Sequence, residues 1–155
     1  MINRELIRIK VVQLTYAYYQ NGNHNMEQAE KELLFSLSKA YDLYNYLLAF
    51  IVAVTREERR RFEIGTQRAQ REGAELPSQR FAYNRFAVQL EENKQLNDFL
   101  EAQKLTWNND IEFVRKVCDQ VEQSRIYQEY MADADDSYEA DREIWRKIYR
   151  TLIQE

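Results

Sequence analysis

Glycine and proline are scarce in this chain. Its 155 residues include three glycines and one proline. β-Hairpins and strand-to-helix turns depend on Gly, Pro or Asn-Gly at defined positions, so an all-β sandwich or a doubly wound sheet is disfavoured. The hydrophobic share of 45% is large enough for a folded core. The sequence therefore predicts an all-α fold.

Cysteine and histidine occur once each, as Cys118 and His24. A lone cysteine excludes an intramolecular disulfide and a cysteine-based metal site, and it is typical of a protein in a reducing cytoplasm. One histidine in a loop is a poor basis for a Ser-His-Asp or Cys-His arrangement, and a di-metal carboxylate bundle needs two Glu-x-x-His pairs. We expect no enzymatic activity, no cofactor and no metal site.

Two sequence features come close to known ligand motifs and fail. The glycines form no phosphate-binding loop pattern. Asp133, Asp135 and Ser137 imitate the first ligands of a calcium loop, but Tyr138 replaces its glycine and Ile144 its bidentate glutamate. This acidic stretch is better interpreted as a linker followed by a helix cap.

Long hydrophobic runs are also missing. The most apolar run, Leu43 to Val54, contains Asn45 and is shorter than the roughly 20 residues that cross a bilayer. Charged residues interrupt the N-terminal apolar residues throughout, so no secretion signal is visible. We expect a cytoplasmic protein without a membrane segment.

Helical periodicity is present from the start of the chain. A first helix is predicted over about Asn3 to Tyr19, with apolar residues on two sides, which is typical of a helix packed between two neighbours. The first stripe consists of Ile2, Leu6, Ile9, Val12, Tyr16 and Tyr19, and the second of Ile7, Val11, Leu14 and Tyr18. The segment Asn21 to Asn25 is predicted as a loop whose asparagine caps the next helix.

An unusually long helix is predicted from about Met26 to Glu72. Its first half is expected to carry core residues, and Arg56 to Arg71 is so charged that we expect it to project beyond the core or to fray. The segment Gly73 to Gln79, which contains Pro77, is the predicted break. The expected core residues of the first half are Leu33, Leu34, Leu37, Tyr41, Tyr44, Leu47, Leu48, Ile51 and Val52.

Four further helices are predicted in the second half of the chain. Their expected ranges are Asn84 to Lys104, Asp110 to Glu122 with a capping box of Asn109 and Glu112, Ser124 to Met131, and a last helix capped by Asp136 with Glu139. The expected architecture is a single all-helical domain over residues 1–155, a bundle with a long central helix and halves at about 1–72 and 81–155. The chain stops soon after Ile153, so it is either part of a longer protein or has a natural terminus in a helix.

The net charge of −4 is unevenly distributed. Residues 86–155 contribute −7, which argues against indiscriminate binding to nucleic acid, so any RNA site must be local. The arginines of Arg56 to Arg71 interleave with glutamates, which favours a solvated, salt-bridged helix face. Arg4 and Arg8 lie one turn apart and are the smaller candidate. The eleven tyrosines suit a half-buried core or stacking on bases near Arg8.

The segment RELIRIKVVQLTYAYYQ, Arg4 to Gln20, resembles the first helix of the transcription antitermination factor NusB. Arg8, Val12, Gln13 and Tyr16 match the family pattern R-x-x-x-[AV]-Q-x-x-Y, and Arg4 matches an earlier family arginine. Three further segments resemble a long-form NusB variant in which the usual ending lies further downstream, so we expect residues 1–155 to be its N-terminal portion. These segments are Glu30 to Phe50, Asn84 to Leu96 and Ser137 to Ile153.

The resemblance implies a helical, non-enzymatic factor that pairs with the small-subunit ribosomal protein NusE. Together they would bind single-stranded boxA RNA and act in the RNA polymerase antitermination complex. Carried over by position, Arg4 and Arg8 contact phosphates, and Gln13 and Tyr16 shape or touch the RNA. The dense arginine cluster of shorter NusB proteins is reduced here to Arg4, Arg8 and Lys10. The alternative is a helical protein-interaction module without RNA contact.

Overall fold

The computed structural model describes residues 3–22 and 25–153. These residues form helices and connecting segments and contain no strand, so the all-α prediction and the long helix are confirmed. The elements are α1 (Arg4–Gln20), α2 (Met26–Glu72), α3 (Arg85–Glu91), α4 (Lys94–Ala102), η1 (Asn108–Asp110), α5 (Ile111–Gln123), α6 (Arg125–Ala132), α7 (Tyr138–Ile148) and η2 (Tyr149–Ile153).

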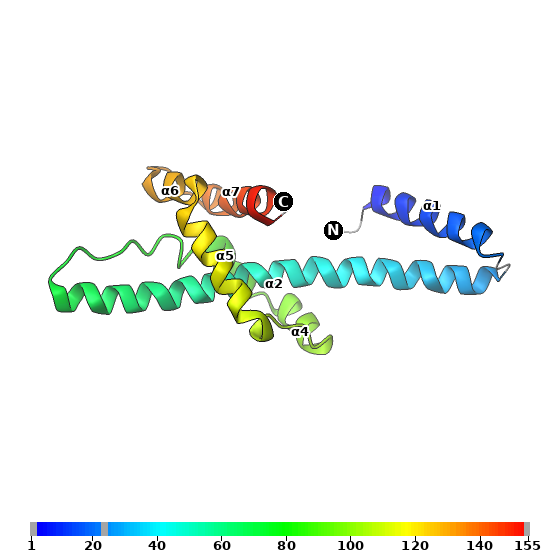
Figure 1. The fold of residues 1–155 in the computed structure, drawn as a ribbon, viewed down its shortest axis with the longest axis horizontal. Coiled ribbons are helices and arrows are strands. Elements are labelled where there is room, and N and C mark those ends of the chain that lie inside the picture. Colours follow the sequence, from blue (N-terminus) through cyan, green and yellow to red (C-terminus); the bar gives the residue numbers. More distant parts are fainter. Residues whose placement is uncertain (1–2, 23–24, 154–155) are drawn as a thin grey trace. The chain divides into compact units, whose positions relative to one another are not determined.

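The chain divides into two compact units, residues 1–47 and 48–155. The division falls inside α2. The sequence instead predicted two halves of the chain that are separated by the segment around Pro77. Figure 1 shows the elements of each unit along the chain. That residues 1–155 form one domain stays a prediction.

The first unit contains α1 and the beginning of α2. The Asn3 side chain caps α1 by accepting a hydrogen bond from the Leu6 backbone N–H at 2.8 Å. Gly22 has a φ of +62°, which suits glycine, and Asn25 accepts from the Gln28 N–H at 3.2 Å. The turn at Asn21 and Gly22 and the capping asparagine are confirmed, and Asn23 of the predicted loop lies outside the described residues. Ile2 and His24 lie outside the described residues.

The prediction that α1 is packed on two sides is wrong. No residue of α1 is buried, and Val12, Tyr16 and Tyr19 keep between 66% and 74% of their surface exposed. Leu14 and Tyr18 are half-buried, and they line an apolar groove against the start of α2. One apolar stripe of α1 therefore faces α2, and the other is uncovered except at Leu6, which is half-buried.

The core lies further along α2 than the sequence indicated. Leu34 is 59% exposed and Tyr44 41%, whereas Ile51 and Val52 are buried as expected. Helical spacing alone assigned the earlier residues to the core, but no described residue of α2 before Asn45 is buried. The α2 contribution to the core starts at Ala49.

The second unit has a continuous hydrophobic core. Phe81 stacks on Trp145 with ring centroids 5.3 Å apart, and Phe50 packs on Trp107 at 4.7 Å. Such aromatic pairs add to the free energy gained by burying their surface. The buried cluster consists of Phe50, Ile51, Val54, Phe81, Ala87, Val114, Val117, Cys118, Val121, Tyr130, Ile144, Trp145 and Ile148.

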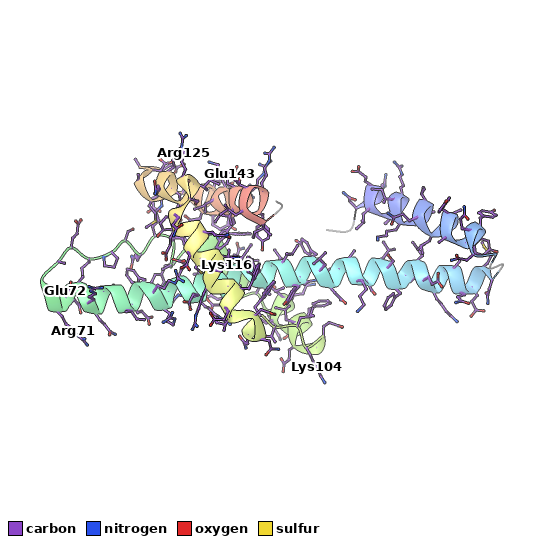
Figure 2. The ribbon with its side chains drawn as sticks, viewed as in Figure 1. Arg71, Glu72, Lys104, Lys116, Arg125 and Glu143 are labelled. Carbon is purple, nitrogen blue, oxygen red and sulfur yellow. The ribbon has the colours of Figure 1, made fainter. Side chains whose placement is uncertain are left out.

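The charged half of α2 is covered at its start and projects beyond the core at its end, without fraying before Glu72 (Figure 1). Glu57 and Glu58 are each only 5% exposed, and α5 crosses α2 at this point (Figure 1). Only the last turns, which end at Arg71 and Glu72 in Figure 2, are mainly solvent-exposed. The helix ends at Glu72, Gly73 follows with a φ of +65°, and the predicted break from Gly73 to Gln79 is confirmed.

Helix caps decide the boundaries in the rest of the second unit. The predicted helix from Asn84 to Lys104 is two helices, because the Asn93 side chain accepts from the Leu96 N–H at 2.8 Å and starts α4. Ser124 caps α6 as predicted. Two cap predictions are wrong: α7 is capped by Ser137 in place of Asp136, and α5 has no side-chain cap.

We predict that Asn84→Ala destabilises the second unit by about 2–3 kcal/mol, because this side chain is fully buried and serves three partners. Its Oδ1 accepts from the Ala87 N–H, and its Nδ2 donates to the Asp141 carbonyl and the Tyr130 hydroxyl. Urea unfolding measures the change. The control Asn93→Ala removes an exposed cap and should cost about 1 kcal/mol. Equal costs would contradict the network.

Candidate nucleic-acid interface on α1

The outer face of α1 brings three of the four sequence-predicted RNA-binding residues together. Arg4 and Arg8 are one turn apart, and Tyr16 follows about two turns after Arg8, rotated by about 80° around the helix, so that all three lie on the half of α1 that faces away from α2. Gln13 lies about 60° around the helix from Tyr16 but about 140° from Arg8, so it is outside this face. All four side chains are exposed. We call the surface formed by Arg4, Arg8, Val12 and Tyr16 the α1 face.

The aromatic end of the α1 face is open to solvent. Tyr16 is 66% exposed, and its hydroxyl accepts a hydrogen bond from the Gln20 amide at 3.0 Å. Tyr19 is 74% exposed one turn away. An exposed ring held at its edge by a neighbouring side chain offers its flat side for stacking. The structure thus places Tyr16 outside the hydrophobic core.

The charged end of the α1 face is not neutralised within the described part of the chain. There, no carboxylate forms an ion pair with Arg4 or Arg8, whereas Lys31 and Lys39 of the same unit pair with Glu27 and Asp42. Exposed guanidinium groups without a carboxylate partner can bind phosphate oxygens. The first unit as a whole contains five basic and five acidic residues, so this positive charge is local.

The arginines of the second half of α2 are used differently. Arg56 and Arg59 both bind the Glu91 carboxylate, at 2.8 and 3.2 Å. Arg60 and Arg61 bind Glu57. The predicted salt bridges are confirmed, but the face is not fully solvated because Glu57 and Glu58 are buried.

These ion pairs keep the carboxylates ionised. The hydrogen bond from Arg60 is the main reason why the pKa of Glu57 is lowered. Burial opposes ionisation of Glu91, but the hydrogen bond from Arg56 and the charge of Arg59 outweigh it, so the Glu91 pKa is lowered too. Arginines engaged in this way are poor phosphate ligands, because each would have to leave a carboxylate.

A buried polar network in the second unit escaped the sequence analysis. Asp141, only 2% exposed, accepts from the Tyr130 hydroxyl at 2.7 Å and from the Arg85 guanidinium at 2.7 Å. Arg80 donates to the backbone carbonyls of Asp133 and Asp135 and so fixes the acidic linker. Only a capping asparagine at Asn84 hinted at this network. Its groups bind one another, which makes it structural.

No family model matches this chain, and neither a curated protein nor a solved structure shows significant similarity to it. Within residues 3–22 and 25–153, no helix is long and apolar enough to span a membrane. The described residues also contain no group of three or more His, Cys, Asp or Glu side chains placed to hold a metal ion.

We predict that Tyr16→Ala changes the free energy of unfolding by no more than about 0.5 kcal/mol, because the ring is exposed. Phe50→Ala, at a position only 2% exposed, should cost about 3–5 kcal/mol. Urea unfolding followed by circular dichroism compares the two variants. A loss of several kcal/mol in Tyr16→Ala would show that α1 is covered on both sides.

Proposed function

We propose that the chain is an RNA-binding factor of the NusB type, which contacts single-stranded RNA through the α1 face. The observation that carries the proposal is the common exposure of Arg4, Arg8 and Tyr16 on one side of α1. Every polar and aromatic residue of the pattern that suggested the resemblance is thus accessible to a ligand.

Each side chain has a chemically distinct part in this proposal. Arg4 and Arg8 bind phosphate oxygens and set the position of the RNA backbone. Tyr16 stacks on an unpaired base, and Gln13 donates or accepts hydrogen bonds at a base edge. Stacking on an aromatic ring requires an unpaired base, which favours a single strand over a duplex.

Two arginines form a small electrostatic site, so we expect weak binding by this chain alone. The acidic excess of residues 86–155 adds repulsion at long range. A partner that contributes further RNA contacts would raise the affinity through the linked second site. On the strength of the resemblance, we propose that this partner is the small-subunit ribosomal protein NusE and that the complex binds boxA RNA with RNA polymerase during antitermination.

We predict that Arg4→Ala with Arg8→Ala weakens binding of a boxA-containing RNA and lowers the slope of log K against log salt by about 2, because about one counterion is released per phosphate contact. Tyr16→Ala should weaken binding by about 1–3 kcal/mol, whereas Tyr16→Phe retains the ring. Fluorescence anisotropy at several salt concentrations, with and without NusE, measures both effects.

The matched control is Arg71→Ala with Arg125→Ala. It removes the same two charges from exposed positions in the second unit. This variant should keep the salt slope of the unmodified chain. If both double variants change affinity and slope equally, binding reflects net charge and the α1 face is not the site.

A second candidate function is a protein-interaction module without RNA contact. The observation in its favour is the amount of uncovered apolar surface in the first unit, which includes Ile9, Val12, Tyr19, Met26, Leu34, Phe35 and Leu43. A purified complex that survives nuclease treatment and breaks on Val12→Asp, together with no RNA binding at low salt, would favour this function over the first.

A further inference from the structure

A carboxyl group without a cation of its own is enclosed between α2 and α5. Glu58 is 5% exposed, and within the described residues its buried Oε1 has no hydrogen-bond partner. Its sequence neighbour Glu57 is equally buried but binds Arg60 and Arg61. Burying an ionised carboxylate without a partner is costly, so a group in this position tends to bind a proton.

A second carboxylate, Glu122 on α5, acts on Glu58 through its charge. Glu122 accepts a hydrogen bond from Arg61 at 3.1 Å, and Arg61 also donates to Asp119 at 2.8 Å. Arg61 therefore joins α2 to α5, and its charge also acts on Glu58.

The remaining titratable groups around Glu58 hold their protons near neutral pH. Burial and the charge of Glu58 raise the pKa of the Cys118 thiol on α5, whose Sγ lies 3.8 Å from the Val54 carbonyl oxygen. Burial, with the charges of Glu58 and Glu122, raises the pKa of Tyr127 on α6 to about 12. Of these groups, Glu58 is the one whose proton exchanges in this range.

We propose that Glu58 keeps a proton in the folded protein and thereby makes the packing of α5 and α6 on α2 sensitive to pH. Two observations carry the proposal: the burial of Glu58 and its unpartnered oxygen. Loss of this proton leaves a negative charge on a buried carboxylate that also experiences the charge of Glu122.

The direction of the pH effect follows from the state that holds the proton. Burial and the charge of Glu122 raise the Glu58 pKa from 4.5 to about 7, so the folded state binds a proton that the unfolded chain has already lost. Stability is greatest below the unfolded pKa and falls as the pH rises towards 7, with a loss of roughly two powers of ten in the folding constant. The pKa values of Glu57, Glu91 and Asp141 are lowered, so the protonation of these three groups affects stability only at more acidic pH.

The direct test is a ¹³C NMR titration of the glutamate side-chain carboxyls in the whole chain. Glu58→Gln identifies the Glu58 signal, and we expect that signal to titrate near neutral pH. In Glu122→Gln its midpoint should move towards ordinary values, because the facing charge is gone. A Glu58 signal that titrates near pH 4.5 in the unmodified chain would overturn the proposal even if Glu58→Gln fails to fold.

Urea unfolding between pH 4.5 and pH 7.5 tests the linked stability. His24→Gln is introduced into every protein, because histidine titrates in the same range. Glu58→Gln should flatten the pH dependence, whereas Glu63→Gln, at an exposed position of the same helix, should leave it unchanged. If the slope persists in Glu58→Gln, another group is responsible and the proposal is wrong.

Discussion

The structure of the second unit depends on the enclosure of charge in the middle of α2. Directly after its apolar turns, α2 places Glu57 and Glu58 in the interior. Buried carboxylates require partners, and α2 itself supplies Arg60 and Arg61 for Glu57. Arg61 then extends to Asp119, Glu122 and the Arg115 carbonyl of α5, while Arg59 reaches Glu91 of α3. The charge pattern of one helix thus determines where two others pack, and Glu58 is the member of this group that has no cation of its own.

Sequence reasoning was most successful where local chemistry decides the structure. The bounds of α2 agree with the prediction because no proline interrupts residues 26–72, and Pro77 marks the break that follows. Ser124 and Asn25 act as the predicted caps. The break between α3 and α4 was missed, since Asn93 is an inconspicuous polar residue until its side chain is seen to cap a helix.

Reasoning failed where the structure depends on distant residues. Periodicity shows that α1 has two apolar stripes but cannot show that only one is covered. The arginines of α2 looked solvated because their partners Glu91, Asp119 and Glu122 lie between 32 and 61 residues further along the chain. For the candidate site, helical spacing predicts that Arg4 and Arg8 lie one turn apart and assigns Tyr16 to an apolar stripe. The exposure of Tyr16 required the structure, because its spacing equally suits a core residue.

The arginines of α2 and those of α1 therefore differ in how available they are to bind a ligand. Arg56, Arg59, Arg60 and Arg61 of α2 are bound to buried or half-buried carboxylates, whereas Arg4 and Arg8 are exposed and form no ion pair within the described residues. The most direct test of the proposed RNA contact is ultraviolet crosslinking of boxA RNA to the chain, followed by tryptic mass spectrometry. The account predicts an RNA adduct on the peptide from Val11 to Lys31, which contains Tyr16. Adducts confined to peptides beyond residue 80 would contradict it.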